Sequence, residues 1–159
     1  MLLWFAGTAV LAIWFVFRDP RFDYRLLVVG AIVPAIVALV VGRATVLDSI
    51  TLHVALLALV MLAVRRGPVR RTLLGLPLGG LLYLVFTGAW VDAEVFWWPF
   101  GGVGLDGAPA TVGERGWWNL ALEAAGAAMC AWIVRRARLV EPEPRRRFAR
   151  TGTLALTAT

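Results

Sequence analysis

Long uninterrupted apolar runs limit what this chain can fold into more than any other feature of its sequence. The run LLVVGAIVPAIVALVVG, residues 26–42, contains no charged side chain, and about 20 such residues in a helix cross the ~30 Å hydrocarbon layer of a bilayer. Four further runs are nearly as apolar, so the sequence predicts five transmembrane spans, at residues 1–17, 26–42, 46–64, 73–91 and 117–134. Because lipid offers the backbone no hydrogen-bond partner, each span is expected to be a helix. With 60% hydrophobic residues, the chain is predicted to be an all-α integral membrane helical bundle.

The basic residues predict the orientation of this bundle. All 16 are arginines, and 14 of them follow the first, third and fifth spans, whereas the two other loops contain only Arg43 and Arg115. Positive residues near spans stay in the cytoplasm during insertion. The sequence therefore predicts an N-terminus outside and a cytoplasmic C-terminus, and no nucleic acid as a partner despite the net charge of +6. Arginine used in place of lysine is typical of GC-rich bacteria, which indicates a bacterial plasma membrane.

The domain organisation follows from the same runs. Residues 1–138 are expected to form the bundle, with an outer aromatic loop at 92–116, and the polar tail 139–159 is expected to be a disordered basic cytoplasmic segment. The first span lacks a basic segment before it and a cleavage site after it, so it is predicted to be a retained helix. It is placed at the periphery. Gly75 and Gly79 are four residues apart and suit close helix contact, either inside the bundle or in a homo-oligomer.

Polar side chains inside the spans carry the strongest functional signal. They are Asp48, Ser49 and His53 in the third span, Tyr83 and Thr87 in the fourth, and Asn119 and Glu123 in the fifth. All lie toward the outer ends of their spans, and an ionisable group in hydrocarbon costs about 2.5 kcal/mol or more unless it finds partners. The pattern predicts a shared outward-facing pocket. The segment GAWVDAEVFWWPFGG, with Trp90, Trp97 and Trp98, is expected to lie across its mouth.

Each ionisable residue also has a simpler interpretation. Asp48 suits the N-terminal end of a helix dipole, and a lone histidine such as His53 is commonly a hydrogen-bonded structural residue. Glu123 can extend toward the outer interface. The pocket hypothesis therefore depends on these residues coming together.

Several of these segments resemble a known family. FDYRLLVVGAIVP, SITLH and FWWPFGG, with the outer end of the fourth span, are similar to the actinobacterial branch of the YdjM-like membrane proteins, which are regarded as membrane-bound metal-dependent hydrolases. The resemblance covers roughly residues 18–102. It implies a divalent metal such as zinc, held by His and Asp and activating water at the membrane face.

The chain departs from the family pattern at the positions that would bind metal. The family's LPD-type motif ends here in Pro34 and Ala35, its HS pair reads Asp48 and Ser49, and its H-x-x-x-D motif has Tyr83 and Thr87 at the two ligand positions.

Asp48, His53 and Glu123 are then the candidate metal ligands and catalytic residues. Three functions stay open: a relative with an eroded metal site that binds a lipid headgroup or a partner at the outer pocket, an active metal-dependent hydrolase with a remodelled site, or a structural accessory subunit. The expected partners are membrane lipids, a second copy or another membrane subunit.

Overall fold

The structure is a computed structural model that describes residues 1–17, 22–102, 105 and 116–154 of the chain. Within these residues the chain forms seven α-helices, two short 3-10 helices and no β-strand. The α-helices are α1 (Leu2–Phe17), α2 (Tyr24–Val41), α3 (Ile50–Ala63), α4 (Pro68–Thr87), α5 (Ala93–Phe96), α6 (Trp118–Arg136) and α7 (Pro142–Thr151), and the 3-10 helices are η1 (Val46–Asp48) and η2 (Ala89–Val91). The predicted all-α fold is confirmed.

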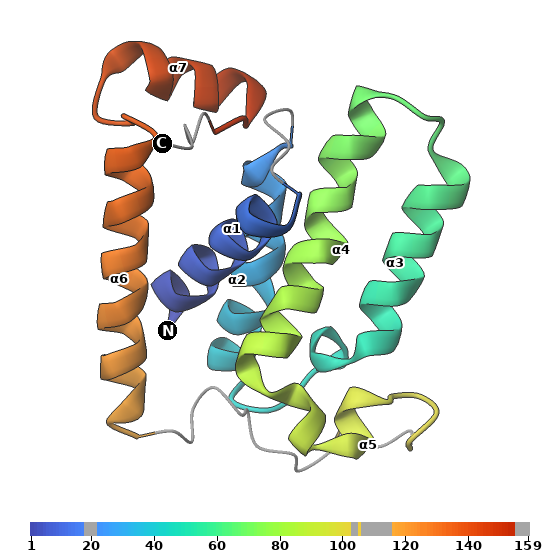
Figure 1. Ribbon diagram of the computed structural model, residues 1–159. Helices are drawn as coiled ribbons and strands as arrows, with labels where there is room; N and C mark the ends of the chain where they lie inside the picture. Colours follow the sequence, from blue (N-terminus) through green and yellow to red (C-terminus); the bar gives the residue numbers. More distant parts are fainter. Residues whose placement is uncertain (18–21, 103–104, 106–115, 155–159) are drawn as a thin grey trace.

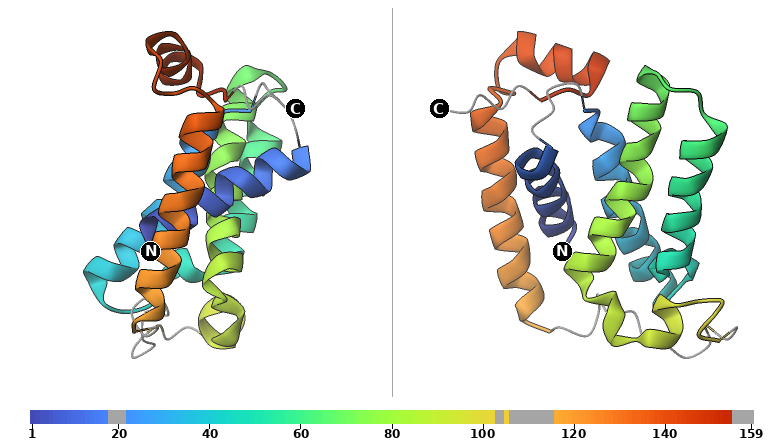
Figure 2. Two further views of the ribbon diagram at one scale, coloured as in Figure 1. Left: turned by 60° about the vertical axis from the view of Figure 1, so that its left-hand side comes forward. Right: turned by 45° about the vertical axis from the view of Figure 1, so that its right-hand side comes forward.

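The long helices run along one common direction. Figure 1 shows α2, α3, α4 and α6 roughly side by side, with α1 crossing α2 obliquely and α7 lying across one end. Both views in Figure 2 place α7 at the end of the molecule opposite α5. Each predicted span overlaps one of the helices α1, α2, α3, α4 and α6, with ends that differ by up to five residues. Of these, α2 and α4 are long and apolar enough to cross a membrane, while α1 and α3 are shorter apolar helices.

The sequence sets the ends of these helices through capping residues. Asp23 begins α2 because its carboxylate accepts a hydrogen bond from the backbone N–H of Arg25 at 3.0 Å. The helix ends at Gly42, whose φ of 71° places it in the left-handed region that glycine adopts without cost. Pro68 starts α4, where its missing N–H has no helical partner to lose. This start lies five residues before the predicted span, because the arginines in the first turns of α4 lower its hydropathy without opposing a helix.

Glycines bring α2 and α4 into direct contact. A Cβ added to Gly30 would lie 2.1 Å from the carbonyl oxygen of Leu76, and one added to Gly79 would lie 2.2 Å from that of Leu27. The two backbones can therefore approach this closely because both positions lack a side chain. The prediction that Gly75 and Gly79 serve close helix contact is confirmed, with α2 as the partner of α4.

The position predicted for α1 is wrong. This helix packs against α2, α4 and α6, and Phe5, Ala9 and Ile13 on it are buried in the hydrophobic core. Gly126 of α6 makes room for it, since a Cβ there would lie 2.2 Å from the backbone nitrogen of Trp4. The first span was placed at the periphery, whereas its buried residues pack against three other helices.

The expectation of a disordered tail is also wrong for the residues that the structure describes. Helix α7 occupies Pro142–Thr151, and Phe148 and Leu154 pack against the core. The two prolines do not prevent the helix, because Pro142 and Pro144 lie in its first turn. Residues 155–159 of the tail, like residues 103–104 and 106–115 of the predicted aromatic loop, lie outside the described part.

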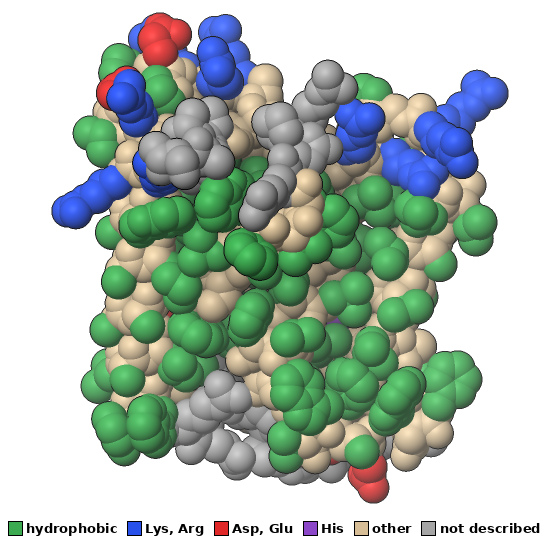
Figure 3. Space-filling model, viewed as in Figure 1, with side chains coloured by type: hydrophobic (Ala, Val, Ile, Leu, Met, Phe, Trp, Pro, Cys, Tyr) green, Lys and Arg blue, Asp and Glu red, His purple; other side chains and the backbone are tan. Residues whose placement is uncertain are grey.

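Charged and apolar side chains separate along the molecule. Figure 3 shows arginine side chains at the end that carries α7 and the α3–α4 connection, while hydrophobic side chains cover most of the rest of that face. Large apolar residues are widely exposed, among them Val40 at 81% and Leu62 at 88%. A surface of this kind suits a hydrocarbon environment rather than water.

Candidate functional site

Five of the predicted pocket residues come together where α3 begins and α4 ends. We call Asp48, Ser49, His53, Tyr83 and Thr87 the Asp48 cluster; all five are buried. Ser49 is the N-cap of α3, because its hydroxyl accepts a hydrogen bond from the backbone N–H of Leu52 and donates one to the carbonyl oxygen of Val46 at 2.8 Å. This cap fixes the directions in which the neighbouring residues of η1 and α3 point.

Both carboxylate oxygens of Asp48 have partners within the chain. One accepts a hydrogen bond from the Tyr83 hydroxyl at 2.8 Å, and the other accepts from the backbone N–H of Thr45 at 2.8 Å and from its hydroxyl at 3.2 Å. Because Tyr83 belongs to α4, the first of these bonds joins α4 to the segment that starts α3. The ring of Tyr83 also packs edge-on against Phe5 of α1, with centroids 5.0 Å apart.

His53 is held between a backbone carbonyl and a glycine. Its Nε2 lies 3.0 Å from the carbonyl oxygen of Leu47, and since a carbonyl only accepts, Nε2 must carry the hydrogen of the neutral ring. The ring lies against Gly80 of α4, where a Cβ would come within 2.4 Å of it. The other ring nitrogen, Nδ1, is buried and has no hydrogen-bond partner among the described residues. His53 therefore fills the contact between α3 and α4.

Glu123 does not join this cluster, which corrects the predicted metal set of Asp48, His53 and Glu123. Its carboxylate accepts the backbone N–H of Leu3 at 3.2 Å and lies 3.0 Å from the N-terminal ammonium of Met1, so it caps the start of α1. Among the described residues, no group of three or more His, Cys, Asp and Glu side chains is placed to hold a metal ion. The residues present do not fit the zinc site that the family resemblance implies, which needs three protein ligands.

The predicted outward-facing pocket is a closed cluster instead. Tyr83 and Thr87 are each 1% exposed and Ser49 is fully buried, and Thr87 turns its hydroxyl back to the carbonyl oxygen of Tyr83. The tryptophans expected at its mouth are not part of the cluster: Trp90 and Trp97 are more than half exposed, and Trp98 is half-buried. Asn119, the remaining predicted pocket residue, is also half-buried. A hollow of about 300 Å³ near Trp97 is lined by residues of the α5 segment only.

The end opposite the Asp48 cluster contains a feature that the sequence did not predict. The C-terminus of α7 rests on the start of α2: Gly152 accepts a hydrogen bond from the backbone N–H of Tyr24 at 2.9 Å, and Arg25 donates to the carbonyl oxygen of Ala149 at 2.8 Å. Arg25 also pairs with the buried carboxylate of Asp23 at 2.8 Å. Burial acts to raise the pKa of Asp23, but the hydrogen bonds and charge of Arg25 outweigh it and hold that pKa below its ordinary value.

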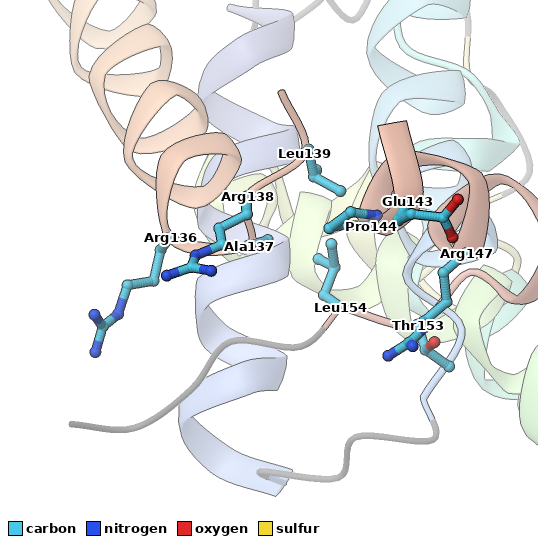
Figure 4. Close-up of a pocket in the computed structure, with 9 residues that line it drawn as sticks. All are labelled: Arg136, Ala137, Arg138, Leu139, Glu143, Pro144, Arg147, Thr153 and Leu154. Atoms are coloured by element: carbon cyan, nitrogen blue, oxygen red, sulfur yellow. The ribbon is translucent and has the colours of Figure 1, made fainter. Parts of the chain in front are cut away.

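Docking of α7 creates a cavity at the α6–α7 corner. It measures about 370 Å³. Figure 4 shows Arg138 of the connection and Arg147 of α7 on the two sides of an apolar floor, while the side chain of Arg136 of α6 extends away from it. The single signal for it in the sequence was the amphipathic pattern PEPRRRFART, whose Phe148 sits among arginines. The expectation of disorder concealed this signal.

Comparison with protein-family models, curated proteins and solved structures gives no match for the chain. The fold and the site therefore define a class only: an all-α protein with two helices long and apolar enough to cross a membrane, and with a buried polar cluster that joins two of its helices.

Proposed function

We propose that the chain is a multi-pass protein of a bacterial plasma membrane, and that it acts as a structural or accessory unit through its surfaces. In this proposal α1, α2, α3, α4 and α6 all lie in the membrane, the arginine-rich end with α7 is cytoplasmic, and the end with Trp90 and Trp97 is outside. The resemblance to YdjM-like proteins then describes a relative in which a structural cluster has replaced the metal site.

The observation that carries the proposal is the hydrogen bonding of Asp48. A catalytic or metal-ligating carboxylate has to reach a substrate or an ion, whereas Asp48 is buried and both its oxygens accept hydrogen bonds, one from Tyr83 and the other from Thr45. Glu123, the second acid of the predicted site, is engaged by the start of α1. Apart from Nδ1 of His53, the polar groups of the Asp48 cluster have hydrogen-bond partners within the chain, and hydrogen bonds between helices hold membrane bundles together.

The surface supports the membrane part of the proposal. Arginines that the structure describes gather at the end with α7 and the α3–α4 connection (Figure 3), while exposed tryptophans occur at the other end, as in the headgroup layer of membrane proteins. Between the ends, hydrophobic side chains cover most of the face shown in Figure 3.

Cysteine labelling tests the orientation. In a Cys130→Ser background, single cysteines are placed at two exposed sites, Phe100→Cys at the aromatic end and Val140→Cys at the arginine-rich end. A membrane-impermeant maleimide should label Phe100→Cys in intact spheroplasts, and Val140→Cys only after lysis. Equal labelling of both in intact spheroplasts, or recovery of the protein in the soluble fraction, would contradict the proposal.

Metal analysis tests the structural assignment of the cluster. Protein purified in detergent after growth with added zinc should contain much less than one metal ion per chain, and His53→Ala should not change that content. Near-stoichiometric metal that is lost in His53→Ala would overturn the assignment and favour the hydrolase.

A further inference from the structure

The cavity at the α6–α7 corner has the charge of an anion-binding site. We call it the basic pocket; its lining residues are Arg136, Ala137, Arg138, Leu139, Glu143, Pro144, Arg147, Thr153 and Leu154. Three arginines and one acid, Glu143, line the pocket. Glu143 also lies 3.9 Å from Arg146, and Glu141 lies 4.0 Å from Arg138, both as exposed ion pairs within one turn. Figure 4 shows Arg138 and Arg147 on opposite sides of Leu154. The pocket therefore combines a positive rim with an apolar floor.

The backbone keeps this rim in place. Arg138 adopts a φ of 51°, a left-handed conformation that arginine seldom takes, and its N–H bonds to the carbonyl oxygen of Arg135 at 3.2 Å. This turn ends α6 and sends the chain into α7. On the other side, Leu154 is buried against the core, so packing fixes the apolar floor of the pocket and the turn at Arg138 fixes the backbone of its rim.

A second concave surface lies on the same side of α6. We call it the apolar groove; it consists of two adjoining hollows of about 410 and 360 Å³ that share Leu11 and Met129. The remaining lining residues are Thr8, Ala12, Trp14, Phe15, Phe86, Ala128 and Trp132. Almost all of this lining is apolar, and it comes from α1, α4 and α6. In a membrane such a groove is filled by hydrocarbon chains.

One face of α6 connects the groove to the basic pocket. Ala128 and Trp132 line the groove and Arg136 lines the pocket, and their spacing of four residues stacks them on that face. Trp132 and Arg136 are therefore separated by one helical turn, a rise of about 6 Å. The ring of Trp132 packs edge-on against Trp14 of α1, with centroids 6.0 Å apart, which marks the border between the two surfaces.

We propose that the basic pocket and the apolar groove together bind one anionic glycerophospholipid from the arginine-side leaflet. The phosphate lies between Arg138 and Arg147, and an acyl chain runs along the groove below Trp132. Anionic lipid fits better than free phosphate because only the lipid also fills the groove. The site rests on the membrane placement proposed above and adds a specific ligand to it.

Lipid binding to the full chain in detergent tests the site. Native mass spectrometry measures binding of dioctanoyl phosphatidylglycerol, with dioctanoyl phosphatidylcholine and inorganic phosphate as separate arms. We expect saturable binding of phosphatidylglycerol, and about tenfold or greater weakening in Arg138→Gln/Arg147→Gln, since each basic residue near a lipid headgroup contributes about one factor of five. Trp132→Ala should weaken phosphatidylglycerol binding as well, because it removes one wall of the groove.

The matched control is Arg65→Gln/Arg66→Gln. It removes the same charge from the same end of the molecule at exposed arginines of the α3–α4 connection, and it should leave binding within about twofold. Equal weakening by the control, equal binding of phosphatidylcholine, or unchanged binding in the pocket variant would overturn the site. Competition by millimolar inorganic phosphate together with no effect of Trp132→Ala would also overturn it, in favour of a site for a free phosphate group.

These outcomes are separate from the membrane proposal. Circular dichroism and a monodisperse elution profile establish that each variant is folded. If the protein stays soluble without detergent, the membrane placement fails whatever it binds; if labelling confirms the placement and the pocket variant binds lipid like the wild type, only the lipid site fails.

Discussion

At the residue scale, the bond between Tyr83 and Asp48 is expected to matter more for stability than for chemistry. Tyr83→Phe removes one donor and leaves a buried carboxylate oxygen without its partner at 2.8 Å, which should lower the free energy of unfolding by about 1–3 kcal/mol. Unfolding in mixed detergent and sodium dodecyl sulfate micelles measures this. A double-mutant cycle with Asp48→Ala, which removes both acceptor oxygens, should show coupling between the two positions; purely additive effects would mean that the bond contributes nothing.

The contact of His53 with Gly80 predicts that a substitution at Gly80 is destabilising and that removal of the His53 ring relieves it. Gly80→Ala places a methyl group where the His53 ring lies, 2.4 Å from its nearest atom, so it should destabilise the fold by about 1–3 kcal/mol, although alanine favours a helix interior over glycine. Gly67→Ala is the control, because its Cβ would meet nothing closer than 4.0 Å. In a His53→Ala background the Gly80→Ala change should no longer destabilise. Persistent destabilisation there would show that His53 is not the obstacle.

At the scale of elements, hydropathy predicted where the helices lie but not how they pack. The apolar runs at 26–42 and 73–91 specify α2 and most of α4 because helix formation in an apolar run is a local property. The neighbours of α1 and the docking of α7 depend on contacts between residues far apart in the chain, such as Tyr24 with Gly152. Hydropathy cannot report such contacts, and for that reason α7 was expected to be disordered.

The close approach of α2 and α4 predicts that Gly79 tolerates substitution less well than Gly80. An alanine at Gly79 meets the carbonyl oxygen of Leu27 at 2.2 Å, and backbone cannot rotate away as the His53 side chain can. Gly79→Ala should therefore cost at least as much as Gly80→Ala, about 3 kcal/mol, and removal of a neighbouring side chain should not rescue it. Unfolding in mixed micelles, with the same Gly67→Ala control, measures both. A neutral Gly79→Ala would show that the two helices can separate without loss.

The contact of α7 with α2 should weaken in acid. The pKa of Asp23 is lowered in the folded protein by Arg25 despite burial, so the carboxylate stabilises the fold above its unfolded value of 3.8, and this stabilisation is lost as the pH falls through the lower folded pKa. We expect Asp23→Asn, which keeps an N-cap, to be less stable than the wild type at pH 6 and to approach it at pH 3. Thermal unfolding at both pH values checks this, and a constant difference between them would contradict it.

At the scale of the whole molecule, the candidate site shows that polar residues predicted at the same depth of a membrane need not lie close to one another. Asp48, Tyr83 and Glu123 were predicted to lie at similar depths, and the order of helices around the bundle decides which of them meet. Because α1 lies next to α6, Glu123 accepts a hydrogen bond from the start of α1 and does not reach Asp48. The sequence identified the polar residues correctly as partners in need of hydrogen bonds, yet the partner of each is set by the arrangement of helices, which no local pattern encodes.

The surroundings of the bundle can be tested with one exposed position. Leu59 on α3 is 59% exposed; Leu59→Asp would be nearly neutral in water, but in hydrocarbon it costs about 2.5–3.5 kcal/mol near the centre of a span. We therefore expect Leu59→Asp to reduce the amount of protein in the membrane fraction several-fold. Val140→Asp, at a position 77% exposed beyond the end of α6, is the control and should leave that amount unchanged. Equal tolerance of both substitutions would place α3 in water and remove it from the proposed set of spans.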